Sequence, residues 1–189
     1  MKALTDYILK FGNLNKEQTD FIASQATRFT LPKGQYFSEA GKIPRQAAFI
    51  LDGIFRLSSY NGKGEEITSY FIHENQFVID YENFEARLPS ADNLQAVTEC
   101  ELLVFSRKDW DKILNTIVEW DKIAEKMYRK RLIETIEKRS PLVSEDATTR
   151  YLLFLKKFPA LANRVPLAYI ASYLGITQQS FSRIRRNIQ

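Results

Sequence analysis

The sequence predicts an α+β protein: a jelly-roll-like, double-stranded β-roll with flanking helices, then a long helix and a small helical domain. Three observations predict this fold class. Short apolar segments separated by turn residues fill residues 28–105. Residues 107–139 contain no glycine or proline, and their apolar residues recur every three or four positions. Residues 166–188 are typical of two short helices that meet at Gly175.

Composition excludes several classes of function. Apolar residues make up 44% of the chain and aromatic residues 13%, which is enough to build a hydrophobic core. The chain has no long apolar run and no apolar segment after a basic start, so we expect a cytoplasmic protein without a membrane-spanning helix or signal peptide. With one cysteine, Cys100, and one histidine, His73, the metal site of a cupin-like enzyme is not available. We predict no catalytic residue, no metal and no enzyme activity, and we expect Cys100 and His73 to be packed side chains.

Two helices are predicted before the roll, within residues 2–27. Apolar residues from Leu4 to Phe11 form one stripe that ends at Gly12. Asn15 is placed to cap a second helix, and Gln18 three residues later completes a capping box.

Turn signals divide the roll into short strands. Asp52-Gly53 and Asn61-Gly62 each stand between apolar segments, which predicts two β-hairpins. The last two strands are expected at Leu94–Val97 and Leu102–Phe105.

The long helical segment predicts a dimer. Its main part carries an apolar stripe that is suited to pairing with a second copy of the chain. A helix that lies on the roll of its own chain would show the same stripe. Ser140-Pro141 ends the helix as a hinge, which divides the chain into residues 1–115 (roll), 116–140 (dimer helix and hinge) and 141–189 (C-terminal domain). The residues assigned to the dimer are Trp120, Ile123, Ala124, Met127 and Tyr128.

The C-terminal residues predict a helix-turn-helix that binds DNA. Leu167, Ile170, Ala171 and Leu174 share one helix face, and Gly175 ends that helix. The second helix presents amide, hydroxyl and guanidinium groups, which pair with base edges and phosphates. A hairpin of two helices with a solvated second helix is the alternative. Residues 141–189 hold seven Lys and Arg against two acidic residues, which favours DNA. The candidate DNA-binding residues are Thr177, Gln178, Gln179, Ser182, Arg183, Arg185 and Arg186.

The segments Ile170–Thr177 and Ser180–Arg185 resemble the helix-turn-helix of the Crp/Fnr family of bacterial transcription regulators. The resemblance is closest to the short members from Bacteroidetes. The turn glycines Gly34, Gly41, Gly53 and Gly62 resemble those of the cyclic-nucleotide-binding β-roll, which is the sensor half of that family. The resemblance implies a homodimer that binds a roughly palindromic site in double-stranded DNA, with RNA polymerase as a further partner and no membrane contact.

The resemblance also places a candidate effector pocket between Gln76 and Leu94. The cyclic-nucleotide pattern needs a glycine, a glutamate and an arginine there, but this chain has Ile79 for the glycine and Ser90 for the arginine. Asp80 could hold a ribose hydroxyl, and Arg87 is a substitute cation three residues away from Ser90. We therefore expect no bound cyclic AMP and no cofactor, so that the roll is a structural body or takes another effector. A ligand sensor in which DNA binding is secondary is the alternative function. The pocket candidates are Ile79, Asp80, Tyr81, Arg87, Ser90 and Ala91.

Overall fold

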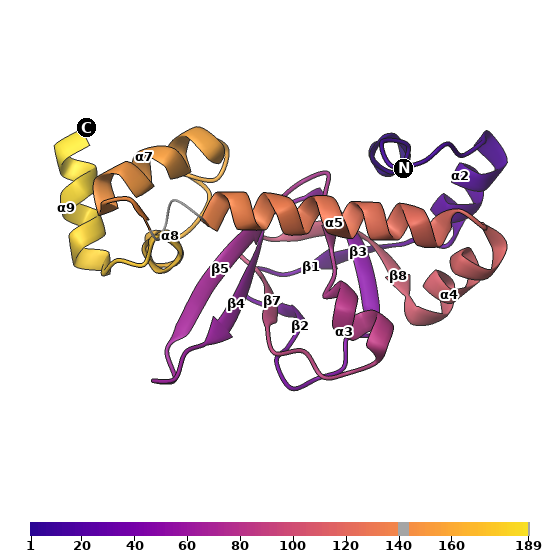
Figure 1. Cartoon of the computed structure of the whole chain (residues 1–189), viewed down its shortest axis with the longest axis horizontal. Coiled ribbons are helices and arrows are strands. Elements are labelled where there is room, and N and C mark those ends of the chain that lie inside the picture. The colour runs from indigo at the N-terminus through magenta and orange to yellow at the C-terminus, as the bar shows by residue number, and fades with distance from the viewer. Residues whose placement is uncertain (140–143, 189) are drawn as a thin grey trace.

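The computed structural model describes residues 1–139 and 144–188, and Figure 1 shows a β-roll with one long helix running across it. Two antiparallel sheets of four strands form the roll, in the orders β1-β8-β3-β6 and β2-β7-β4-β5. Between the sheets lie apolar side chains such as Ala48, Phe55 and Leu102. The predicted α+β fold with a double-sheet roll is confirmed. The strands are β1 (Thr27–Leu31), β2 (Tyr36–Ser38), β3 (Gln46–Asp52), β4 (Phe55–Tyr60), β5 (Glu66–Ile72), β6 (Phe77–Val78), β7 (Asn93–Ala96) and β8 (Cys100–Ser106).

The two predicted hairpin turns have different outcomes. Asn61-Gly62 joins β4 to β5, which pair along their length as predicted. The prediction for Asp52-Gly53 was wrong: β3 and β4 belong to different sheets, so this turn carries the chain from one sheet to the other. Gly53 has a φ of +110°, and a Cβ there would lie 2.6 Å from Cys100 Sγ. A hairpin turn and a connection between two sheets both need a glycine here, so the sequence around Gly53 does not distinguish the two.

Three short helices, α1 (Lys2–Ile8), α2 (Lys16–Ser24) and α4 (Arg107–Thr116), gather near one end of the long helix (Figure 1). The capping box at the start of α2 is confirmed: the Asn15 side chain accepts from the Gln18 N–H, and the Gln18 side chain accepts from the Asn15 N–H, both at 2.9 Å. A further short helix, α3 (Tyr81–Ala86), lies between β6 and β7, where no helix was predicted.

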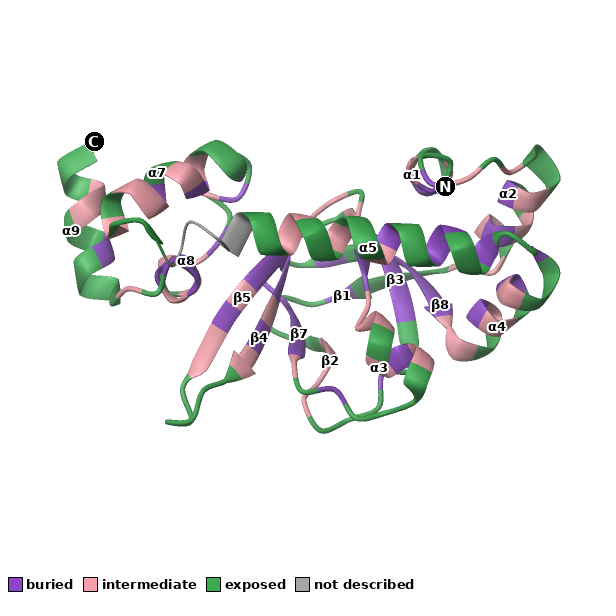
Figure 2. Ribbon diagram, in the orientation of Figure 1, coloured by how far each residue is buried: buried purple, intermediate pink, exposed green. Residues whose placement is uncertain are grey.

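The long helix α5 (Trp120–Arg139) packs its first half into the core of its own chain. Trp120, Ile123, Ala124 and Met127 are between 0% and 7% exposed, and Tyr128 stacks on Tyr81 with ring centroids 5.1 Å apart. The assignment of Trp120, Ile123, Ala124 and Met127 to a dimer contact was therefore wrong, because the roll and the N-terminal helices already cover them. Tyr128 is only partly buried, and its assignment stays a prediction. Figure 2 shows the burial of this half and the exposure of the other.

The second half of α5 exposes apolar side chains instead. Leu132 is 45% exposed, Ile133 is 49% exposed and Ile136 is 60% exposed. The predicted hinge at Ser140-Pro141 lies outside the described residues.

Helices α7 (Ala147–Lys157), α8 (Leu167–Leu174) and α9 (Gln178–Ile188) form the C-terminal domain. Asp146 caps α7 by accepting hydrogen bonds from the backbone N–H groups of Thr148 and Thr149. The domain packs against the roll through β5, whose Phe71 lies 5.5 Å from the ring of Tyr173 on α8.

Candidate nucleic-acid interface and ligand cavity

The two predicted short helices that meet at Gly175 are present as α8 and α9. Ile170, Ala171 and Leu174 are buried, and Gly175 has the positive φ, +65°, that ends α8. Thr177 caps α9, since its hydroxyl accepts from the Ser180 N–H at 3.2 Å. Arg150 of α7 donates to the Leu174 carbonyl at 2.6 Å, so a third helix fixes the turn.

The outer face of α9 is polar and open. Phe181, fully buried, anchors the helix to the domain and meets the Tyr151 ring edge-on at 4.9 Å. Arg185 is partly buried, and α9 lies at the far end of the molecule from α1 and α2 (Figure 1). This arrangement leaves one face of α9 exposed to solvent. The fully open candidates are Thr177, Gln178, Gln179, Ser182, Arg183 and Arg186.

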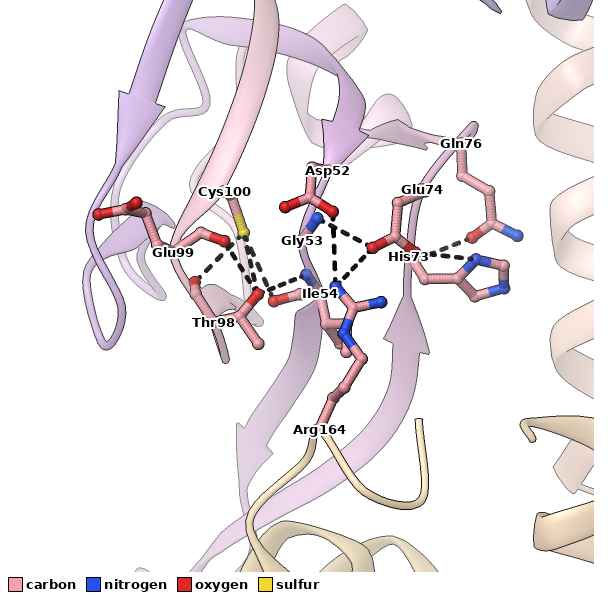
Figure 3. A network of polar contacts seen from close by, with 10 residues as sticks. All are labelled: Asp52, Gly53, Ile54, His73, Glu74, Gln76, Thr98, Glu99, Cys100 and Arg164. Carbon is pink, nitrogen blue, oxygen red and sulfur yellow. Dashed lines mark hydrogen bonds and ion pairs between the residues drawn. The ribbon is translucent and has the colours of Figure 1, made fainter. Parts of the chain in front are cut away.

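Polar contacts join the C-terminal domain to the roll around the apolar contact of Phe71. Arg164 donates to Glu74 at 2.6 Å and lies 3.7 Å from Asp52, as Figure 3 shows. The Thr68 N–H donates to Ser172 Oγ at 2.9 Å. The guanidinium of Arg56 lies 3.9 Å from the centre of the Tyr169 ring.

Electrostatics favour the Arg164–Glu74 pair. Partial burial opposes ionisation of Glu74, but Arg164 and two backbone N–H groups, including that of Gly53, outweigh it and hold its pKa below the ordinary 4.5. Arg56 is only 3% exposed, and within the roll it donates to Gln95 at 2.8 Å and pairs with Glu66. Arg56 and Glu74 are thus fixed in the roll and reach toward the other domain.

A cavity of about 600 Å³ lies between the roll, α3 and α5. Its size is that of a small-molecule site. Aromatic residues make up much of the lining, and α5 contributes Met127, Arg131 and Thr135. The aromatic lining residues are Tyr7, Tyr70, Phe77, Tyr81, Trp110 and Tyr128.

Half of the predicted pocket residues line this cavity. Ile79, Asp80 and Tyr81 do, whereas Ser90 and Ala91 are not among its lining residues. Ser90 is 3% exposed and its hydroxyl donates to the Asp92 carbonyl at 2.9 Å, so it holds a loop in place.

The prediction that Arg87 substitutes for the missing cation was wrong. Arg87 has a φ of +57° at the end of α3 and lies 3.8 Å from Asp111, outside the cavity. No lysine or arginine between α3 and β7 is therefore among the described residues that line the cavity.

Among the described residues that line the cavity, Arg131 is the one arginine, and sequence reasoning missed it. The signal for it is its position: Ala124, Met127, Tyr128 and Arg131 follow the i, i+3, i+4, i+7 spacing of one helix face. A charged residue on the inward-facing side of a helix places a polar group inside the protein.

The single cysteine and histidine differ in their surroundings. Cys100 is fully buried as expected, and burial raises its pKa to about 11, so it remains a thiol at neutral pH. His73 is partly exposed, which contradicts the expectation of a packed side chain, and lies 3.9 Å from Glu74. Among residues 1–139 and 144–188, no three His, Cys, Asp or Glu side chains gather as a metal site would need.

None of the helices in the described ranges is both long and apolar enough to cross a membrane.

Comparison with known proteins agrees with this architecture. Residues 28–117 match the family model of the cyclic nucleotide-binding domain. No curated protein matches the chain in sequence.

Solved structures with the same fold cover nearly the whole chain. The c-di-GMP-responsive global regulator CLP of Xanthomonas campestris is 18% identical, with a TM-score of 0.73 over 93% of this chain and 92% of its own. A protein of Eubacterium rectale, described as a transcriptional regulator of the crp/fnr family, is 15% identical, with a TM-score of 0.74 over 97% and 88%. FixK2 of Bradyrhizobium japonicum is 17% identical, with a TM-score of 0.70 over 86% and 84%. The chain therefore has the fold of the Crp/Fnr transcription regulators.

Proposed function

We propose that this protein is a dimeric transcription regulator that binds a specific DNA sequence through α9. The observation that carries the proposal is the face of α9, where amide, hydroxyl and guanidinium groups lie open on a helix anchored by Phe181. The net positive charge of residues 141–189 supports phosphate contact. The fold shared with CLP and FixK2 agrees with this function and does not favour an enzyme.

Roles within α9 follow from position. Gln178 and Gln179, in the first turn, would reach base edges, with adenine as the natural partner of an amide. Arg183, in the middle of the exposed face, would read a guanine. Arg185 and Arg186, later in the helix, would contact phosphates. Two copies on a twofold axis would read half-sites about 34–36 Å apart.

The exposed apolar half of α5 is the better candidate for the dimer contact. Leu132, Ile133 and Ile136 lie within one turn of each other on α5 and are each 45% to 60% exposed. Water contact with such a face is costly, and a second copy of the same helix would cover it. Introducing glutamates at Ile133 and Ile136 should shift the protein to the 22.0 kDa monomer in sedimentation at micromolar concentration. The control is Lys108→Glu, which makes the same change in charge at an exposed position on α4.

The DNA assignment is tested in two steps. Bound fragments are first selected from a randomised DNA pool, and the selected DNA is then titrated with two variants. Arg183→Ala should cost roughly 1–3 kcal/mol per half-site and relax preference at one base position. Arg186→Ala should weaken all sequences alike and reduce the salt slope by about one. Lys33→Ala removes the same charge from an exposed position on the roll and serves as the control. If Arg183→Ala left the sequence preference unchanged, the assignment of this face to base reading would be wrong.

The cavity favours a second role, that of a sensor. A volume of about 600 Å³ between the roll and α5 is large enough for an effector. Cyclic AMP is not supported as that effector, because no lysine or arginine between α3 and β7 is among the described residues that line the cavity.

A further inference from the structure

The cavity is lined by the guanidinium of Arg131, whose hydrogen-bonding capacity is only partly used. Arg131 Nη1 donates to the Phe77 carbonyl, and the guanidinium lies 5.9 Å from the centre of the Tyr70 ring. In the described ranges, no carboxylate forms an ion pair with Arg131. A guanidinium has five N–H donors, and a carbonyl takes only part of that capacity. Burial is the main cause that lowers the pKa of Arg131.

Nearby charges limit what Arg131 can bind. Glu134 of the cavity lies 3.8 Å from Lys130, and Glu82 accepts a hydrogen bond from the Tyr128 hydroxyl at 2.6 Å. Asp80 and Glu134 also act on Arg131 electrostatically and favour its charged form. Lys10 and Lys130 are the other Lys or Arg side chains in the lining, which also includes the acids Glu74 and Asp92. Because these acidic side chains lie around Arg131, a ligand with one negative charge meets less electrostatic repulsion in the cavity than a ligand with two.

Aromatic rings form the surfaces on which the rest of a ligand would lie. Tyr81 and Tyr128 stack with their planes 26° apart, and Phe77 packs edge-on against Trp110 at 6.2 Å. Tyr7 lies 5.9 Å from Phe77. Burial is the main cause that raises the pKa values of Tyr7, Tyr81 and Tyr128 to about 12, so all three are neutral phenols at physiological pH. Flat apolar groups pack well against such rings.

We propose that this cavity binds a small aromatic carboxylate, whose carboxylate group pairs with Arg131 and whose ring lies among Tyr81, Tyr128 and Phe77. A guanidinium fork matches the two oxygens of a carboxylate, and such a ligand brings one negative charge and a flat apolar body. The proposal deepens the sensor role proposed above, and only the regulatory consequence of binding rests on that role.

The test compares carboxylates with their uncharged amides of the same shape. Benzoate and indole-3-carboxylate are titrated into the purified full chain, beside benzamide and indole-3-carboxamide, with calorimetry and melting temperature as readouts. We expect saturable binding of at least one carboxylate and binding of its amide that is roughly 10- to 100-fold weaker, because a hydrogen bond to a charged group is lost. This comparison uses the unaltered protein and needs no variant to fold.

Variants then locate the charge. Arg131→Gln should weaken carboxylate binding by the same roughly 10- to 100-fold and leave amide binding nearly unchanged. Arg131→Lys should weaken carboxylate binding less than Arg131→Gln does. Arg129→Gln, on the same helix but exposed and paired with Glu125, is the matched control. Two results with the unaltered protein would overturn the proposal: equal affinity for carboxylate and amide, or no saturation by either carboxylate at millimolar concentration. Unchanged carboxylate binding in Arg131→Gln would also overturn it, and so would binding of cyclic AMP that is tighter than that of the carboxylates. Because these readouts involve no DNA, failure of the DNA selection would leave carboxylate binding standing, and the reverse also holds.

Discussion

Two surfaces attach helices to the roll, and they differ in chemistry. The first half of α5 enters the core with Trp120, Ile123 and Met127, and the Trp120 ring meets that of Trp110 at 5.3 Å. The C-terminal domain instead meets the roll through a small apolar centre at Phe71, surrounded by hydrogen bonds and charged contacts from Arg56 and Arg164.

The difference indicates which attachment can open. Separating α5 from the roll would expose tryptophan and isoleucine side chains to water, at a cost comparable to unfolding. The C-terminal domain has its own core around Phe154, Leu174 and Phe181. Its contacts with the roll have the mixed character of an interface between domains, which allows relative motion. We therefore expect α5 to stay attached and the C-terminal domain to be the part that moves.

The largest effect should come from Trp120→Ala, which leaves a cavity in the first interface. Loss of a buried tryptophan ring should reduce the free energy of unfolding by ~3–5 kcal/mol. Urea denaturation followed by far-UV circular dichroism measures it without relying on tryptophan fluorescence. Val118→Ala, at a position 90% exposed two residues earlier, should change stability little. A loss below ~1 kcal/mol in Trp120→Ala would show that α5 is not part of the core.

The contrast within α5 also shows what the sequence could predict. Capping at Asn15 and Thr177 and the turn at Gly175 depend on neighbouring residues, so local patterns were sufficient for them. The apolar stripe of α5 was recognised, but its partner was not. Periodicity reveals an apolar face, while the identity of the covering surface depends on contacts far apart in the sequence.

The candidate site was likewise predicted only in part. The exposed face of α9 follows from helical spacing alone. The cavity residues include members of α1, β4, β5, β6, α3, α4 and α5, and no local pattern brings those segments together. Arg87 was selected because it is close to Ser90 in sequence, but the left-handed backbone at Arg87 ends α3, and its side chain lies toward Asp111. Arg131 lies 41 residues after Ser90 in the sequence and reaches the cavity from the opposite wall.

A smaller effect is expected from Tyr169→Ala, which removes the ring beside Arg56. A cation–π contact with a largely desolvated guanidinium is worth ~1–2 kcal/mol, so docking of the C-terminal domain should weaken by about that amount. Hydrogen exchange should rise in α8, whereas β4 stays protected because Arg56 keeps Gln95 and Glu66 as partners. Tyr169→Phe retains the ring and should behave as the unaltered protein. Equal loss of protection in β4 and α8 would mean that the contact supports the roll itself.

The smallest effect should come from Arg164→Gln, which removes one exposed ion pair from the second interface. Arg164 is 36% exposed and Glu74 is 20% exposed, so the pair should contribute ~0–1 kcal/mol, and less at high salt. Because the folded-state pKa of Glu74 lies below 4.5, this stability is present above pH 4.5 and is lost as pH falls through the folded pKa. The difference in unfolding free energy between the unaltered protein and Arg164→Gln should therefore shrink in acid. Glu74→Gln keeps an acceptor for the Gly53 N–H and should remove the same pH dependence. If the Arg164→Gln difference persisted unchanged well below pH 4, the contribution of Arg164 would come from packing of its side chain and not from the charge of Glu74.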